Sequence, residues 1–327
     1  MSLYFRYHWR EIKDYYPIVL FTDLQNKLQQ QYDIKFQPID NNFHKFGQGS
    51  IFSCMHMSII NADNNKYILI SLFDHWKTHF FKYFGWQPEL MTQFLYGAGF
   101  NYLEYFYFKY LYRNNTNIYL PNDIDTKYHQ FFYHTYYTNH DNIETDLFNT
   151  YNMDKTLPQL YFRGYMWNFR SLMSEYLLNN KDIIIIDKNI NNNNYDYITY
   201  LKDLKNYRCA LSLPGGTEIC NRDIECFAIG VPVIRPTILT NYPDPLIPDY
   251  HYINCYGGPR YFDHKPKFIS YKDFSNNVID TWNRVKNNID YLNFIAKNAR
   301  EWYKRNCTLE ANSNYILSKI NISSLYN

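Results

Sequence analysis

Three arginines beside glycine turns are the residues of this chain best suited to hold an anionic ligand. Arg163 precedes Gly164, Arg170 lies six residues after that glycine, and Arg222 lies six residues after Gly216. Arginine presents a planar fork of N–H donors that can hold two phosphate oxygens, and glycine permits close approach of the backbone. Where such a turn leads into a helix, free N–H groups and the positive end of the helix dipole add to the attraction. The two turns together predict an anion site, although each alone is also typical of a strand–turn–helix with surface arginines.

The second turn belongs to a predicted strand–turn–helix–strand unit over residues 207–234. An apolar run ending at Leu213 is typical of a buried strand, and Pro214-Gly215-Gly216 break it. Apolar residues then recur at helical spacing, and either Thr217 or Asn221 can cap this helix. Open α/β sheets bind ligands at such turns, at the carboxyl ends of their strands.

The helix predicted after this turn carries a carboxylate as well as an arginine. Glu225 lies three residues after Arg222, on roughly the same helix face, and can accept hydrogen bonds from a ribose diol. The glycine turn, the arginine and the carboxylate together indicate a site for a nucleotide diphosphate. The alternative is a tight turn followed by a surface pair of opposite charges, and residue spacing alone does not separate the two.

Two segments of the second half resemble the donor site of glycosyltransferases that have two Rossmann-like halves, the GT-B fold. They are most similar to the CAP10-like (GT90) and exostosin-like (GT47) families. The matching residues of the later segment are Leu213-Pro214-x-Gly216, Asn221-Arg222, Glu225 and Gly230-x-Pro232-Val233-Ile234. The matching residues of the earlier segment are Phe162-Arg163-Gly164 and Arg170.

This resemblance implies transfer of a sugar from a nucleotide-diphosphate sugar, expected to be a UDP-sugar, to a hydroxyl group of a protein or glycan. Arg222, with Arg163 or Arg170, would hold the diphosphate, and Glu225 would hold the ribose. The donor-site residues that it implies in the two turns are Gly164 in the earlier turn and, in the later turn, Pro214, Gly215, Gly216, Thr217 and Glu218. In the retaining enzymes of this fold an earlier glutamate would fall at Thr217, and here the glutamate is one place further on.

A general base for the acceptor hydroxyl is expected in the first half of the chain. Residues 66–73 are the clearest strand there, and Asp74 follows it directly. A polar residue just past a central parallel strand points toward the ligand, so Asp74 is the candidate base. The alternative is that Asp74 only caps the helix that follows.

The fold class that these patterns predict is α/β with two Rossmann-like halves. We expect an acceptor-side domain over residues 1–154 and a donor domain with C-terminal helices over residues 155–327. The first half shows few strong strands, so it is compatible with a reduced Rossmann domain. Residues 16–22 are predicted to form a strand, and residues 86–89 to lead into a helix.

Composition excludes several other classes. The 327 residues are 46% hydrophobic, typical of a globular protein, and the net charge of +2 gives no general attraction to nucleic acid or to membranes. We expect no signal peptide and no membrane span, because no apolar run is long enough, and therefore a cytoplasmic location. Six cysteines without a C-x-x-C pair are expected to be free, buried thiols rather than zinc ligands.

No metal or cofactor is expected besides the nucleotide-sugar substrate. Asp123 and Asp125 form the one Asp-x-Asp pattern considered, and it lies in an irregular stretch. The chain is therefore predicted to be a metal-independent hexosyl- or pentosyltransferase, in which arginines and a helix start stabilise the leaving diphosphate. The alternatives are a non-catalytic sugar- or nucleotide-binding module and a sugar-nucleotide epimerase of the same fold; the oligomeric state stays open.

Overall fold

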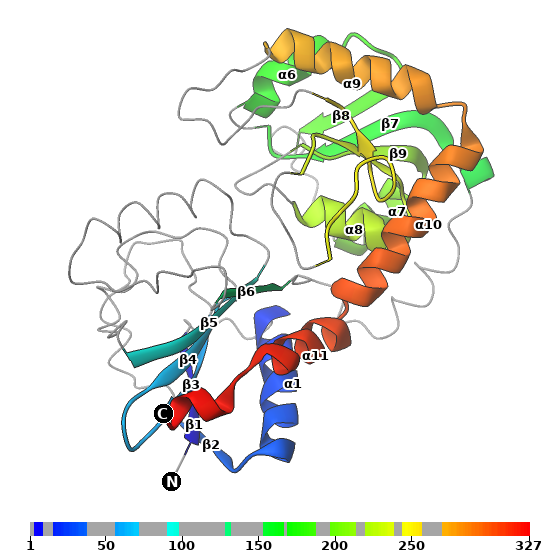
Figure 1. Ribbon diagram of the computed structural model, residues 1–327. Coiled ribbons are helices and arrows are strands. Elements are labelled where there is room, and N and C mark those ends of the chain that lie inside the picture. The colour runs from blue at the N-terminus through cyan, green and yellow to red at the C-terminus, as the bar shows by residue number, and fades with distance from the viewer. Residues whose placement is uncertain are drawn as a thin grey trace. The chain divides into compact units, whose positions relative to one another are not determined.

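The computed structural model describes residues 3–8, 16–37, 56–71, 90–97, 128–131, 153–166, 169–187, 197–213, 220–238, 244–256 and 270–327. The chain divides into a first unit of residues 1–139 and 306–327 and a second unit of residues 140–305. Each unit contains its own sheet and its own hydrophobic core (Figure 1). The predicted α/β class is therefore confirmed.

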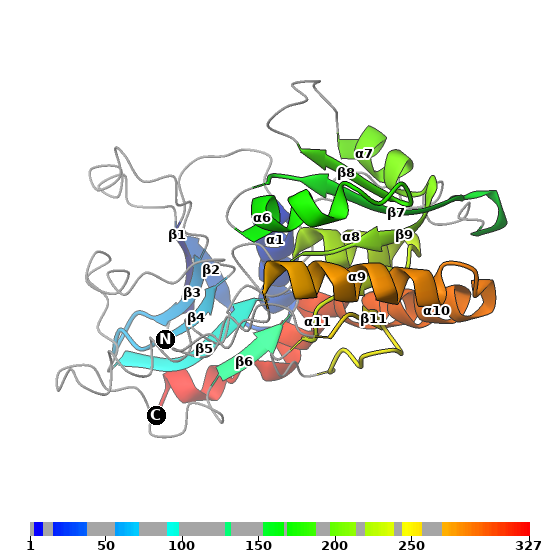
Figure 2. The same ribbon diagram turned by 90° about the horizontal axis from the view of Figure 1, so that it is seen from above.

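The first unit is built on a six-stranded mixed sheet in the order β2-β1-β3-β4-β5-β6, part of which can be followed in Figure 2. β3 is antiparallel to both β1 and β4, and the remaining pairs are parallel. Its strands are β1 (Leu3–His8), β2 (Ile34–Gln37), β3 (His56–Asn61), β4 (Tyr67–Ser71), β5 (Met91–Gly97) and β6 (Tyr128–Phe131).

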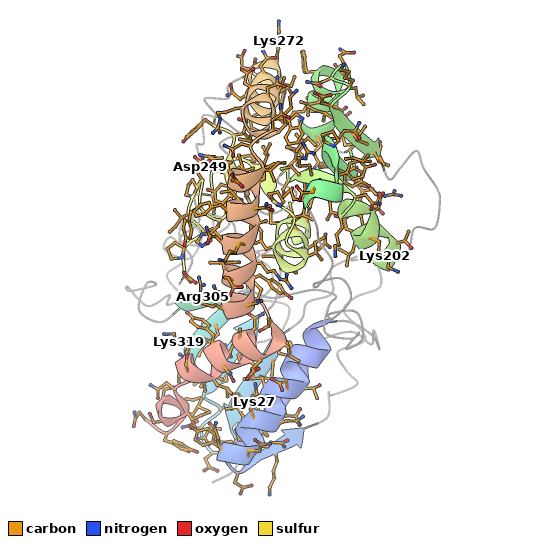
Figure 3. The ribbon with its side chains drawn as sticks, turned by 90° about the vertical axis from the view of Figure 1, so that its right-hand side faces the viewer. Lys27, Lys202, Asp249, Lys272, Arg305 and Lys319 are labelled. Atoms are coloured by element: carbon orange, nitrogen blue, oxygen red, sulfur yellow. The ribbon has the colours of Figure 1, made fainter. Side chains whose placement is uncertain are left out.

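Two helices far apart in sequence pack together in the first unit. α1 (Tyr16–Gln31) and α11 (Leu309–Lys319) lie side by side, and Lys27 Nζ donates to Ser313 Oγ at 2.6 Å (Figure 3). A short 3-10 turn over Ile322–Leu325 follows α11 and adds Leu325 to the same core. The end of the chain is thus part of the core that α1 and the first sheet form.

Two predictions for the first unit are wrong. Residues 16–22 belong to α1 and not to a strand, because Leu20, Leu24 and Leu28 recur at helical spacing and are all buried on one face. Residues 91–97 form β5 and not a helix, since pairing with β4 on one side and β6 on the other outweighs the local helix signal.

The second unit is built on a five-stranded, all-parallel sheet in the order β11-β10-β9-β7-β8. This is the doubly wound arrangement of Rossmann-like and flavodoxin-like folds, with the first strand between the second and the third. Its strands are β7 (Leu157–Gly164), β8 (Ile183–Asp187), β9 (Tyr207–Leu211), β10 (Val233–Arg235) and β11 (Ile253–Asn254).

Helices cover both faces of this sheet, as buried parallel strands require. α6 and α9 pack together on one face, and α7 and α8 pack together on the other (Figure 1). α10 covers α8, where the rings of Phe227 and Trp302 meet edge to face with centroids 5.8 Å apart. These helices are α6 (Phe169–Leu177), α7 (Tyr197–Leu204), α8 (Asn221–Ile229), α9 (Tyr271–Val285) and α10 (Ile289–Asn306).

Candidate functional site

The strand order of the second unit creates a switch point between β7 and β9. The chain leaves β7 for β8 on one side and then returns to form β9 on the other side of β7. Consequently α6, which follows β7, and α8, which follows β9, cover opposite faces of the sheet. Ligands of open α/β sheets bind outside the carboxyl ends of the strands at such a point.

Arg222 reaches from the first turn of α8 to the carboxyl end of β7. Its Nη2 donates a hydrogen bond to the carbonyl oxygen of Arg163, and the guanidinium lies 4.2 Å from the centroid of the Phe162 ring. A Cβ atom on Gly164 would lie 2.7 Å from Nη2 of this arginine. Any side chain at position 164 would therefore have to displace the Arg222 guanidinium, which occupies the space beside the glycine.

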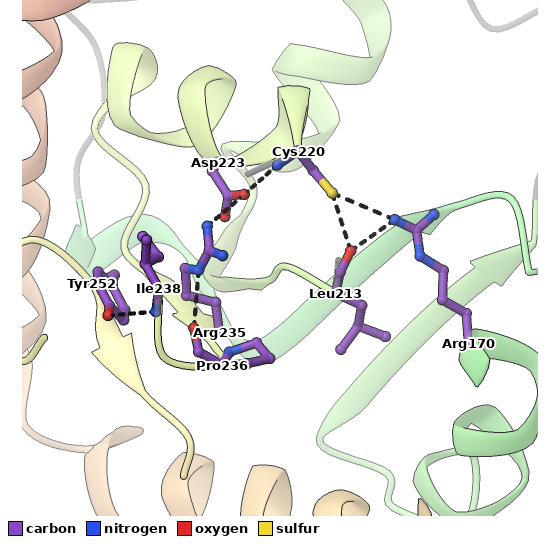
Figure 4. Close-up of polar contacts among 8 residues, drawn as sticks. All are labelled: Arg170, Leu213, Cys220, Asp223, Arg235, Pro236, Ile238 and Tyr252. Atoms are coloured by element: carbon purple, nitrogen blue, oxygen red, sulfur yellow. Dashed lines mark hydrogen bonds and ion pairs between the residues drawn. The ribbon is translucent and has the colours of Figure 1, made fainter. Parts of the chain in front are cut away.

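Arg170 makes the reciprocal contact, from α6 to the carboxyl end of β9 (Figure 4). Its Nη2 donates to the carbonyl oxygen of Leu213 at 2.7 Å and lies 3.6 Å from Sγ of Cys220. Its Nη1 donates to the carbonyl oxygen of Tyr165 at 3.3 Å. Arg170, from the helix after β7, thus bonds the backbone at the end of β9. Arg222, from the helix after β9, bonds the backbone at the end of β7.

Both arginines are buried, fixed cations. Arg170 is 7% exposed and Arg222 is 8% exposed. The Nε of Arg222 is buried without a hydrogen-bond acceptor among the described residues. A guanidinium carries five N–H donors, and the Nε–H of Arg222 is one that no described residue accepts. A cation held in place at low effective dielectric attracts an anion more strongly than a solvated one does.

The start of α8 is capped differently from the prediction. Cys220 is the N-cap, and Asn221 is the first helical residue. The backbone N–H of Cys220 donates to Oδ2 of Asp223 at 2.7 Å, and its thiol lies 3.3 Å from the carbonyl oxygen of Leu213. The Asp223 carboxylate, three residues into the helix, therefore reaches back to the backbone N–H of the N-cap residue, as the third helical residue of a capping box does. Thr217, the other predicted cap, lies outside the described residues.

A buried ion pair ties this helix start to the neighbouring strand. Arg235, the last residue of β10, places Nη1 2.8 Å from Oδ2 of Asp223, and both side chains are almost fully buried. Figure 4 shows this pair on the opposite side of Cys220 from Arg170. The pair thus joins the carboxyl end of β10 to the first turn of α8.

Glu225 lies one turn further along α8 and faces α7. Its Oε2 accepts a hydrogen bond from the hydroxyl of Tyr200 at 3.1 Å, and both side chains are buried. Burial and the adjacent Glu225 carboxylate raise the pKa of Tyr200, so that the hydroxyl stays protonated and donates. The predicted role of Glu225 as a ribose ligand stays a prediction.

The cysteines of this region are not equipped for nucleophilic chemistry. Burial, followed by the neighbouring Asp223 carboxylate, raises the pKa of Cys220. Burial and Glu225 raise the pKa of Cys226 well above its ordinary value. Because the thiolate is the nucleophile, protonated thiols of this kind are inert. None of the five described cysteines takes part in a disulfide, as predicted, and all but the half-buried Cys220 are buried.

The structure brings together five of the predicted site residues. These are Arg163, Gly164, Arg170, Arg222 and Glu225. The remaining predicted site residues lie outside the described part of the chain: Asp74, Pro214, Gly215, Gly216, Thr217 and Glu218, together with Asp123 and Asp125. Asp223 and Tyr200 were missed, although a carboxylate near a helix start is a recognisable capping signal.

The arrangement can bind and stabilise a phosphate-bearing anion. Four buried arginines lie at or beside the carboxyl ends of the strands of the second unit: Arg163, Arg170, Arg222 and Arg235. No group of three or more metal-ligating side chains occurs among the residues that the structure describes. Within the same residues, no helix combines the length and apolar character that crossing a bilayer requires.

Comparisons with known proteins add little to this geometry. No protein-family model matches the sequence, and no curated protein matches it. Among solved structures, the chain is similar to the crystal structure of TarM, with a TM-score of 0.33 and 11% identity over 83% of this chain and 66% of that one. It is also similar to a mutant of S. aureus TarM in complex with fondaparinux, α-GlcNAc-glycerol and UDP, with a TM-score of 0.32 and 13% identity over 81% of this chain and 64% of that one. The chain thus spans slightly less than two thirds of these chains, and likeness at this level carries no argument about function.

Proposed function

We propose that this chain is a glycosyltransferase that moves a sugar from a nucleotide-diphosphate sugar to a hydroxyl group of a protein or glycan. A UDP-sugar is the expected donor. The observation that carries the proposal is the pair of buried arginines, Arg170 and Arg222, which reach from helices on opposite faces to the ends of β9 and β7. This pair lies at the switch point, where open α/β sheets bind nucleotides.

The chemistry of the transfer fits these residues. As the bond between the anomeric carbon and the diphosphate oxygen breaks, negative charge develops on the diphosphate that leaves. Arg170, Arg222 and the N–H groups at the start of α8 are donors held in place before the reaction, so stabilising this charge costs little reorganisation. Such stabilisation replaces a catalytic metal, in keeping with the metal-independent reaction that the sequence predicts.

The remaining roles in this proposal come from the sequence. Glu225 would hold the ribose of the donor, and Asp74 would take the proton of the acceptor hydroxyl as general base. The donor would bind to residues 155–327, with the acceptor side supplied by residues 1–154. The transferred sugar would be a hexose or a pentose.

A thermal-shift screen tests the donor site. UDP-, GDP-, CMP- and dTDP-sugars are added to the wild type, to Arg170→Ala and to Arg222→Ala. A ligand at 100 times its dissociation constant stabilises the protein by about 2.7 kcal/mol. We expect a shift with UDP-sugars that both substitutions abolish. Arg208→Ala is the matched control, because Arg208 lies near the amino end of β9 and bonds the carbonyl oxygen of Lys286. A wild type that responds to none of these donors would contradict the proposal.

Turnover separates the transferase from the two alternatives. A transferase consumes the bound donor faster when an acceptor hydroxyl is present and releases the nucleoside diphosphate. An epimerase converts the sugar nucleotide without any acceptor, and a binding module shows the thermal shift but no turnover. Chromatography of the nucleotide products with and without a glycan acceptor distinguishes the three.

A further inference from the structure

Asp223 places a full negative charge in the first turn of α8, where the proposed diphosphate site needs positive potential. Its side chain is fully buried, and Oδ2 accepts the Cys220 N–H at 2.7 Å. The start of a helix carries the equivalent of only about half an elementary charge. A carboxylate left unneutralised here would outweigh the helix dipole and repel a phosphate.

Arg235 supplies the neutralising charge from the end of β10. Its Nη1 lies 2.8 Å from the same Oδ2, in a pair with side-chain exposures of 1% for Arg235 and 0% for Asp223. The arginine is itself fixed, because Nε donates to the carbonyl oxygen of Pro236 at 3.2 Å and the guanidinium lies 5.6 Å from the centroid of the Tyr252 ring (Figure 4). Screening by salt is weak for a buried pair, so the two charges act together on their surroundings.

We infer that Arg235 is a positioning residue of the nucleotide site. It neutralises Asp223 and fixes that carboxylate as the cap of α8, and the helix start then stays attractive to the diphosphate held by Arg170 and Arg222. Arg235 does so through Asp223 and without touching the ligand. This inference rests on the proposed function.

The electrostatic role and a purely structural ion pair make opposite predictions for Asp223→Asn. The amide oxygen of asparagine still accepts the Cys220 N–H. The negative charge is lost, however, and the positive charge of Arg235 is no longer neutralised. If the pair acts electrostatically, this variant binds an anion more tightly than the wild type does. If the pair only holds the fold together, the variant binds equally or more weakly.

The experiment is a calorimetric titration of UDP into the wild type, Asp223→Asn, Arg235→Gln and the double variant Asp223→Asn/Arg235→Gln. At an effective dielectric constant of about 20, one charge roughly 10 Å from the ligand changes affinity on the order of tenfold. We expect Asp223→Asn to bind about tenfold tighter with a steeper salt dependence, Arg235→Gln to bind about tenfold more weakly, and the double variant to stay within about threefold of the wild type. Asp182→Asn is the control, because Asp182 pairs with Lys286 just before the amino end of β8.

Each outcome decides the matter. Affinity that is unchanged or weaker in Asp223→Asn, while the wild type binds UDP, overturns the inference and leaves the proposed function standing. If Arg235→Gln fails to fold, as the loss of one partner of a buried pair can cause, the other two variants still decide. A wild type that binds neither UDP nor pyrophosphate contradicts the inference and the proposed function together.

Discussion

Gly164→Ala tests the close fit of Arg222 at the end of β7. The added Cβ atom would lie 2.7 Å from Nη2 of Arg222 and 3.2 Å from Cζ of Phe162, whereas ordinary contacts begin at 3.4 Å. The nearest atom belongs to the far end of a flexible side chain, so the guanidinium is displaced and the backbone stays in place. Arg222 then loses its hydrogen bond to the carbonyl oxygen of Arg163.

Gly164→Ala should weaken UDP binding strongly but lower the free energy of unfolding only moderately. Hydrogen bonds of charged groups contribute about 1.5–3 kcal/mol each, so one misplaced arginine–phosphate contact weakens UDP binding by about 10- to 100-fold. The φ angle of Gly164 is not in the left-handed region, so alanine fits the backbone and restricts the unfolded chain, which stabilises by about 0.4–1 kcal/mol. This gain offsets part of the lost bond, and we expect the free energy of unfolding to fall by no more than about 2.6 kcal/mol.

Calorimetric titration with UDP and urea unfolding measure the two quantities on the same protein. Gly164→Ala is compared with Arg222→Ala and with the double variant. If alanine acts through the arginine, it has no further effect on UDP affinity when Arg222 is already absent, because the two changes remove one interaction. Full UDP affinity in Gly164→Ala, or an additive loss in the double variant, would refute this reasoning.

Two further predictions concern stability. Tyr200→Phe removes the donor to Oε2 of Glu225 inside the protein and should lower the free energy of unfolding by about 1–3 kcal/mol in urea, while an unchanged midpoint and slope would show that the bond contributes nothing. The pKa of His251 is lowered from its usual 6.5, because burial lowers it more than the Asp244 carboxylate raises it, and its Nδ1 accepts the Ile247 N–H. The unfolded chain therefore binds the extra proton first, and the free energy of unfolding should decrease as pH falls through about 6.5, by at most about 1.4 kcal/mol per pH unit. In His251→Asn, whose amide oxygen can accept the same bond, this part of the pH dependence should disappear; a slope equal to that of the wild type would contradict the assignment.

The second unit could be predicted well because its central strands, β7, β9 and β10, are buried on both faces. Residues 183–186 and 209–213 are apolar or small without interruption, and turn residues delimit them. Gly230 ends α8, and its φ of 77° is the left-handed conformation that glycine favours at a helix end.

The first unit shows where local pattern is insufficient. The run Ile18-Val19-Leu20-Phe21 has the branched and aromatic residues of a strand, yet it lies in α1. A short apolar run fits a strand and one turn of a buried helix equally well, and only packing decides between them. Here Leu20 and Phe21 join the core that Leu24 and Leu28 continue.

The contacts of the site could not be predicted even where its residues could. Arg170 and Arg222 stood out by residue type and by their place after glycine turns. Their acceptors are backbone carbonyls, which every residue provides, so nothing in the sequence marks Leu213 or Arg163 as a partner. Arg170 meets Leu213, which is 43 residues away, because the strand order places β9 directly beside β7.

The most direct test of the diphosphate site compares UDP with uridine by calorimetric titration of the wild type and of Arg222→Ala, with Arg208→Ala as control. If the buried arginines at the switch point hold the diphosphate, the wild type and the control bind UDP at least about tenfold more tightly than uridine, since one charged hydrogen bond is worth that much. In Arg222→Ala this preference should decrease by about tenfold, because Arg170 and the start of α8 remain. Equal affinities for UDP and uridine in the wild type, or an undiminished preference for UDP in Arg222→Ala, would contradict the proposed site.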